Sequence, residues 1–189
     1  MADLGISRDE AYHLLNEMVT QDNLKKHCLA TEVIMRDLAS KLGYDPDLWG
    51  IAGLLHDLDF EETKDDPQRH GLVTAKILEE KNVSKEIIDA IKAHNAEALG
   101  IERKNPIDFA ITAAETITGM VVATTLVYPD KKIKSVKPKS ILKRMKAKEF
   151  ARRVNRDHIK LCEKLGIPLA EFAELSLKAM SKIDKELGL

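Results

Sequence analysis

The sequence is poor in cysteine: its 189 residues include two, Cys28 and Cys162, and no Cys-x-x-Cys pair. This scarcity argues against a disulfide framework and against a zinc site built from thiolates, and it favours a reducing cytoplasm. The N-terminal stretch MADLGISRDE lacks the apolar region of a signal peptide. We therefore expect a cytoplasmic protein that is not exported.

Aromatic residues and nucleotide-binding glycine motifs are also scarce. The chain has four Phe, three Tyr and one Trp, no G-x-G-x-x-G motif and no P-loop, and no alternating strand pattern of useful length. The sheet-based nucleotide folds are therefore excluded. Hydrophobic residues make up 44% and charged residues 32% of the chain, which is enough to form a core within a soluble protein. We predict an all-α fold, a single-domain helical bundle with a small C-terminal helical extension.

Proline, glycine and capping residues divide the chain into helices. Ser7 and Glu10 form a capping-box pattern, and Asp45-Pro46 and Asn105-Pro106 are typical helix starts. The expected helices cover about 8–19, 23–43, 46–59, 68–81, 85–98, 106–129, 138–146, 148–154, 156–166 and 168–186. We assign residues 1–130 to a core, and residues 131–189 to a basic segment and C-terminal helices that pack on this core.

One apolar stretch, 109–128, is about as long as a membrane-spanning helix. It contains Glu115 and five threonines, which favour the central helix of a soluble bundle. We expect no membrane association.

The net charge of −1 conceals an asymmetry between two parts of the chain. Residues 131–156 contain twelve Lys or Arg and one acid, Glu149, whereas the remainder contains 18 basic and 30 acidic residues. Such a basic block indicates either an anionic ligand or a solvated surface. Arg144, Lys148, Arg152 and Arg153 are candidate phosphate-binding residues, because Arg binds phosphate through paired donors. Nucleic-acid binding is disfavoured, because aromatic residues are not interleaved with the basic ones.

Four of the six histidines lie beside apolar residues, on helices expected from the sequence. They are His27, His56, His70 and His94, and His56 is followed directly by Asp57 in the apolar stretch WGIAGLLHDLDF. Each alone is consistent with a core histidine bound to a carbonyl group. Glu115, which interrupts the most apolar helix, alone is consistent with a buried ion pair.

A metal centre explains these residues together. A buried unpaired carboxylate costs several kcal/mol, and a divalent cation compensates both carboxylate and neutral imidazole. The predicted ligands are His27, His56, Asp57, Glu115, His70 and His94. A donor set of imidazole and carboxylate without thiolate suits one or two ions of Fe, Mn, Co, Ni or Zn.

The order His27, His56-Asp57, Glu115 resembles the H…HD…D signature of the HD-domain superfamily of metal-dependent phosphohydrolases. The segments AGLLHDLDF and AAETITG resemble its central motif and its last-ligand helix, and the resemblance covers about residues 20–125. The segment EFAELSLKAM is similar to that of uncharacterised members with this compact layout. The resemblance implies that His70 and His94 hold a second ion and that Asp57 bridges the two ions.

Three positions depart from the family pattern. Glu115 stands where the last ligand is usually Asp, and Phe60 stands where many binuclear members have Lys, with Lys64 a possible substitute. His94 is followed by Asn95, and no GYP sequence occurs, which argues against a cyclic-dinucleotide phosphodiesterase.

The resemblance implies hydrolysis of a phosphate ester, because a metal lowers the pKa of bound water to roughly 7. We predict a phosphomonoesterase or phosphodiesterase that acts on a small phosphorylated compound, with a nucleotide as one candidate, and with Asp57 and His56 as catalytic residues. The alternatives are a non-catalytic metal-binding regulator or interaction protein, a diiron oxygenase, and a nucleic-acid-binding module that uses the basic segment. The oligomeric state is left open.

Overall fold

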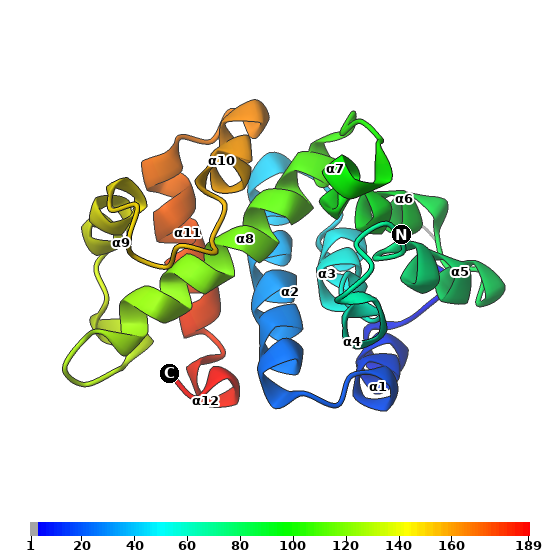
Figure 1. Ribbon diagram of the computed structural model, residues 1–189, viewed down its shortest axis with the longest axis horizontal. Coiled ribbons are helices and arrows are strands. Elements are labelled where there is room, and N and C mark those ends of the chain that lie inside the picture. The colour runs from blue at the N-terminus through cyan, green and yellow to red at the C-terminus, as the bar shows by residue number, and fades with distance from the viewer. Residues whose placement is uncertain (1–3) are drawn as a thin grey trace.

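The computed structural model describes residues 4–189, and within this range the chain forms α-helices and short 3-10 helices without a strand (Figure 1). This confirms the all-α prediction. The first half contains α1 (Arg8–Met18), α2 (Asp22–Leu42), α3 (Pro46–Leu55), α4 (Phe60–Thr63), α5 (Leu72–Glu80), α6 (Lys85–His94) and α7 (Ala96–Leu99). The second half contains α8 (Pro106–Leu126), η1 (Ile133–Ser135), α9 (Pro138–Lys146), α10 (Arg156–Ile159), η2 (Lys160–Leu165), α11 (Leu169–Ser181) and α12 (Asp184–Leu187).

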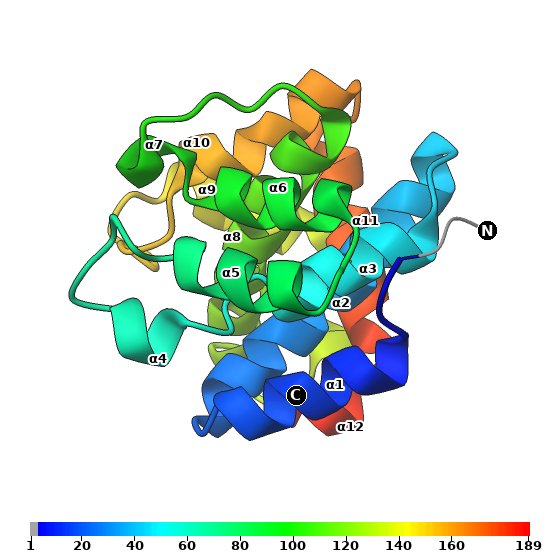
Figure 2. The ribbon, with the colours of Figure 1, turned by 90° about the vertical axis from the view of Figure 1, so that its right-hand side faces the viewer.

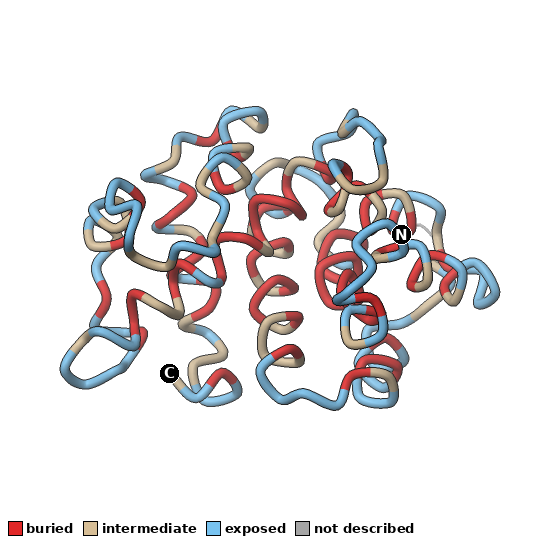
Figure 3. Tube along the Cα trace, in the orientation of Figure 1, coloured by how far each residue is buried: buried red, intermediate tan, exposed pale blue. Residues whose placement is uncertain are grey.

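Two long helices, α2 and α8, cross at the centre of the molecule (Figure 1). On one side α3 packs against α2, and α6 packs against both α3 and α8 (Figure 2). On the other side α11 packs against α2, α8 and α9, while α10 and η2 cover α8. The buried residues line the facing sides of these helices (Figure 3). The assignment of 1–130 and 131–189 to a core and an appended part stays a prediction.

Local capping explains where the main helices begin. The side chain of Ser7 accepts from the backbone N–H of Glu10, and the Glu10 carboxylate accepts from that of Ser7. Asp45 accepts from the backbone N–H groups of Asp47 and Leu48, with Pro46 at the first helical position. These caps satisfy N–H groups that have no partner inside a helix, so the starts follow from sequence alone.

The apolar helix α8 is long and apolar enough to cross a membrane by length and composition. In the structure 61% of its most apolar 18-residue stretch is buried inside the protein. It is a core helix of the bundle.

Several helix ends differ from the sequence predictions. The helix expected over 46–59 ends at Leu55, and residues 56–59 form turns, so His56 and Asp57 lie just beyond α3. The segment 61–68, expected as a polar loop, begins with most of α4. The helices expected over 85–98, 156–166 and 168–186 are each divided in two.

The helix expected over 148–154 is wrong, because this segment forms consecutive turns. The guanidinium group of Arg156 donates to the carbonyl oxygens of Ala147, Phe150, Ala151 and Val154. The carbonyl oxygens of Ala147 and Ala151 also accept turn hydrogen bonds from the N–H groups of Phe150 and Val154. Ala151 has a positive φ of 45° that an α-helix does not allow. We call residues 147–155 the basic turn.

Candidate metal centre

Five predicted ligands converge from four parts of the chain. His27 lies on α2, His56 and Asp57 follow α3, His70 lies in the turn before α5, and His94 is the last residue of α6. Two groups of potential ligand atoms result, one from His27, His56 and Asp57 and the other from Asp57, His70 and His94. Asp57 belongs to both.

The close approach of α2 and α3 brings His27 to His56. Gly53 makes this approach possible, because a Cβ at this position would lie 3.0 Å from Cγ of Met35 and 3.1 Å from the carbonyl oxygen of Thr31. At the resulting separation, Nε2 of His27 lies 3.1 Å from Nε2 of His56.

A tight turn brings His70 to His94. Gly71 caps α5 with a φ of +85°, a conformation that favours glycine. A Cβ there would lie 3.4 Å from the carbonyl oxygen of Ile91 and 3.6 Å from Cε1 of His94. The turn places Nε2 of His70 2.8 Å from Nε2 of His94.

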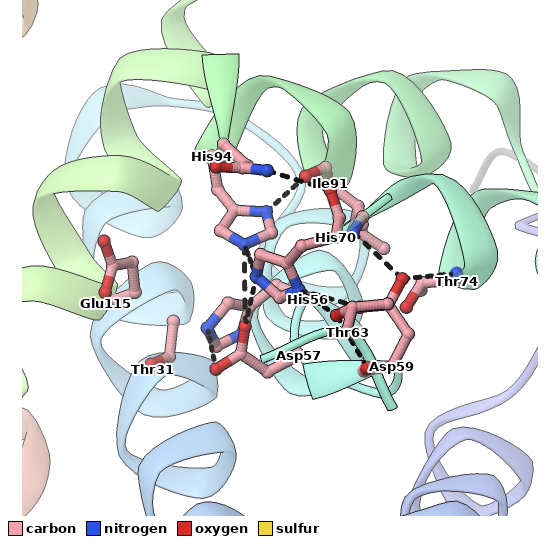
Figure 4. A network of polar contacts seen from close by, with 12 residues as sticks. Thr31, His56, Asp57, Asp59, Thr63, His70, Thr74, Ile91, His94 and Glu115 are labelled. Carbon is pink, nitrogen blue, oxygen red and sulfur yellow. Dashed lines mark hydrogen bonds and ion pairs between the residues drawn. The ribbon is translucent and has the colours of Figure 1, made fainter. Parts of the chain in front are cut away.

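The two carboxylate oxygens of Asp57 face different histidine pairs (Figure 4). Oδ1 lies 3.1 Å from Nε2 of His70 and 3.5 Å from Nε2 of His94. Oδ2 lies 3.6 Å from Nε2 of His27 and 3.5 Å from Nε2 of His56. Ligands about 2.1 Å from a metal ion lie about 3.0 Å apart in octahedral and about 3.4 Å apart in tetrahedral geometry. Each group therefore has the spacing of three ligands around one ion.

The opposite ring nitrogen of each histidine has its own partner, which leaves Nε2 directed at the centre. Nδ1 of His56 donates to the carbonyl oxygen of Gly53 at 2.8 Å, and Nδ1 of His94 donates to that of Ile91. Metal-binding histidines almost always donate their second ring N–H in this way.

Side chains hold the other two rings. Nδ1 of His27 lies 2.9 Å from Oγ1 of Thr118, whose hydroxyl donates to the carbonyl oxygen of Glu115, so Thr118 accepts from His27. Nδ1 of His70 lies 2.9 Å from Oδ1 of Asp59. If all four rings were neutral, these bonds would place the proton on Nδ1, and the lone pairs of the four Nε2 atoms would converge on one another and on Asp57. A cation relieves this arrangement, and the donor set fits a divalent metal.

The pKa values reflect the same crowding. Burial lowers the pKa of His56 to about 3. Burial also acts to lower the pKa of His70. Its hydrogen bonds to Asp57 and Asp59 outweigh the effect of burial and raise this pKa to about 9. Burial opposes ionisation of Asp57, yet the histidines around it, His56 first, hold its pKa well below the ordinary value. Asp57 is thus an anion in a buried site, as a metal ligand must be.

Glu115 lies near this centre but outside both ligand groups (Figure 4). Its Oε1 accepts from the hydroxyl of Thr116 at 2.5 Å, and burial raises its pKa. Its role as a ligand stays a prediction.

The predicted phosphate-binding residues lie on the surface of the C-terminal part. Lys148, Arg152 and Arg153 are exposed on the basic turn, with Arg152 paired to Glu149 at 3.1 Å. The guanidinium group of Arg144 lies over the ring of Phe150, 5.2 Å from its centroid. No described contact joins these four side chains to the clustered histidines, and phosphate binding by them stays a prediction.

Asp59 is the main feature that the sequence interpretation missed. Its side chain is fully buried, and it accepts from Nδ1 of His70 and from the backbone N–H groups of Gly71 and Thr74. The signal available was a second acid, two residues after Asp57, in the same apolar segment.

We expect Asp59→Ala to weaken binding of one metal ion by about 10- to 100-fold, because it releases the ring of His70 and the turn at Gly71. Titration of metal-free protein with Mn²⁺ or Co²⁺ measures this change. The exposed neighbour Asp65 provides the control, since Asp65→Ala removes an acid without touching a histidine. Equal affinities in both variants would show that Asp59 has no part in the metal centre.

Comparison with known proteins agrees with this geometry. Residues 24–120 match the HD domain family. Ribonuclease Y of Chlorobium luteolum (strain DSM 273 / BCRC 81028 / 2530) is 33% identical over 96 residues, which cover 51% of this chain and 18% of that relative. No solved structure matches the chain. The matched segment contains the five clustered candidate ligands, and the chain belongs to the HD domain family.

Proposed function

We propose that the protein is a metal-dependent phosphohydrolase that acts on a small phosphorylated compound. The observation that supports this most directly is the pair of three-residue groups that share Asp57. A shared carboxylate between two imidazole pairs is suited to two ions a few ångströms apart, as in phosphate-ester hydrolases. When bound, divalent metal ions lower the pKa of water and neutralise charge on a phosphoryl group.

The residues of the chain have distinct tasks in this proposal. Asp57 keeps its negative charge and offers one oxygen to each group. His27 and His56 complete one group, and His70 and His94 complete the other. The outer hydrogen bonds to Thr118, Asp59 and the backbone hold the rings in place, so the site is formed before a substrate arrives.

The substrate is expected to be a phosphomonoester or phosphodiester, and a nucleotide remains a candidate. The name of the similar ribonuclease indicates action on RNA, which contains phosphodiester bonds, and this supports phosphate-ester chemistry without identifying a substrate here. Arg144, Lys148, Arg152 and Arg153 are proposed to attract the phosphate group through their charge. Both cysteines are free and buried, which fits action in the cytoplasm.

A screen of phosphate esters tests this function. Chelator-treated protein should be inactive, and addition of Mn²⁺, Co²⁺, Ni²⁺, Zn²⁺ or Fe²⁺ should restore hydrolysis of nitrophenyl phosphates or nucleotides. Hydrolysis of none of these esters by protein that is shown to contain metal would contradict the proposal. The position of Glu115 outside both groups would then favour the second candidate, a metal-binding protein without catalysis.

We further expect His70→Ala and His94→Ala each to reduce the bound metal from about two ions per chain to about one, because the group at His27 and His56 remains complete. Metal analysis of purified protein measures the ratio, and thermal unfolding checks the fold. His13→Ala is the matched control, because His13 is exposed and its ion pair is with Glu17, away from the clustered histidines. Unchanged metal content in both variants would mean that these histidines do not bind an ion.

A further inference from the structure

A groove of about 550 Å³ lies between α2, α8 and the C-terminal residues, and it reaches the metal centre at His27. Its walls are mainly apolar and include Ala30, Val122, Ala123, Leu126 and Leu187. The polar residues among its lining are Asn23, Lys26, His27 and Thr118. The groove thus combines an apolar floor with a few polar groups, as binding sites for small molecules usually do.

The groove adjoins the metal centre at one candidate ligand, His27. His27 and Thr118 both line it, and Nδ1 of His27 is bonded to Oγ1 of Thr118. The side chain of His27 is 24% exposed, whereas that of His56 is 1% exposed. His27 is also more exposed than Asp57, His70 or His94. His27 is therefore the residue at which the groove and the metal centre meet.

The face of α8 that borders the groove is open along its length. Gly119 is exposed, Val122 and Ala123 are partly exposed, and Leu126 is 51% exposed. These positions follow Glu115 at intervals of about one helical turn, so they form one stripe that leads away from the metal centre. A molecule with its phosphate at the centre would lie along this stripe.

We propose that the groove binds an apolar body of the substrate, so that the substrate class is a phosphate ester with an alkyl or aryl group. This inference rests on the proposed phosphohydrolase function for the position of the phosphate. The volume lies within the range of about 300–1,000 Å³ typical of sites for small ligands. Lys26 lines the groove one residue before His27, and its ammonium group pairs with Asp22 at 2.8 Å.

Another cavity, of about 580 Å³, lies along α1 but does not fit this role. Its lining includes Asp9, Glu10 and Glu17, and it contains none of the clustered histidines. Its acidic walls would repel a phosphate group.

A chain-length series of alkylphosphonates tests the inference by binding, independently of turnover. Methyl-, butyl- and hexylphosphonate would be titrated into metal-loaded protein by calorimetry. Full burial gives about a fourfold gain in affinity per methylene, and we expect about twofold because one side of the groove is open. Hexylphosphonate should therefore bind on the order of thirtyfold more tightly than methylphosphonate.

Two variants of α8 locate the effect. Ala123→Trp fills the groove, so the ratio of hexyl to methyl affinity should fall to about one. Leu126→Ser removes apolar wall without adding bulk and should lower the same ratio. Val127→Trp is the matched control: Val127 is exposed and does not line the groove, so this variant should keep the wild-type ratio.

The outcomes separate this inference from the proposed function. Binding of methylphosphonate without any dependence on chain length would overturn the groove inference and leave the phosphate site intact. A chain-length dependence that survives both Ala123→Trp and Leu126→Ser would overturn it too, because the apolar body would then bind elsewhere. Failure of inorganic phosphate and of every phosphonate to bind metal-loaded protein would reject the phosphohydrolase proposal. The groove would then be tested with an anilinonaphthalene dye, whose binding Ala123→Trp should abolish.

Discussion

Asp57→Ala is expected to empty both halves of the metal centre. The variant removes the one side chain that belongs to both ligand groups, so each retains only two imidazoles. Loss of an outer hydrogen-bond partner already costs about 10- to 100-fold in metal affinity, and loss of a direct ligand should cost more at each half. Metal analysis after purification without chelator should find less than about a tenth of the wild-type content, and metal-dependent hydrolysis should be lost with it.

Asp57→Asn provides a second test in case the alanine variant does not fold. It keeps the shape of the side chain and removes the charge that compensates the cations. The control is Asp66→Ala, which removes an exposed acid from the loop after α4. Wild-type metal content in both Asp57 variants would exclude the clustered histidines and Asp57 as a metal centre.

A buried ion network between α1 and α2 should have the second largest effect, on stability. The carboxylate of Glu32 on α2 is 4% exposed and accepts two hydrogen bonds from Arg8 and one from Arg36, each at 3.0 Å. The double substitution Arg8→Met and Arg36→Met leaves this carboxylate buried without these donors. We expect the free energy of unfolding to fall by about 3–5 kcal/mol, measured by urea denaturation.

The triple variant that also carries Glu32→Met is the matched control. It replaces these three side chains with apolar ones of similar length, and such replacements are often neutral or stabilising. Asp47, which also pairs with Arg36 at 2.6 Å, is exposed and stays solvated. We expect it to recover most of the lost stability. If the double variant is as stable as wild type, the network does not constrain α1 against α2.

Helix starts depend on local contacts and can be predicted from the sequence. The starts of α1, α3 and α8 were predicted, because Ser7, Asp45 and Asn105 act on N–H groups two or three residues away. Helix ends were predicted less well. The helix before His56 ends four residues early, and the segment 148–154 forms turns around Arg156, whose hydrogen bonds to four carbonyl groups cannot be read from helical propensity.

For the candidate site, the sequence determined the kind of chemistry. Imidazoles and carboxylates placed in apolar segments need compensation wherever the fold buries them. The order of His27, His56-Asp57 and Glu115, together with His70 and His94, indicates the HD family. The kind of chemistry and the family resemblance depend only on residue type and order, which do not change on folding.

Only the tertiary structure decided that these residues form two ligand groups with Asp57 in common. Close packing at Gly53 and the turn at Gly71 join side chains that are 24 to 29 positions apart, and they direct one oxygen of Asp57 at each pair. The support of His70 by Asp59, the position of Glu115 outside both ligand groups and the groove beside His27 arise in the same way. The physical reason is that distances between side chains on different helices depend on packing and rotamers over the whole core, and no local pattern records them.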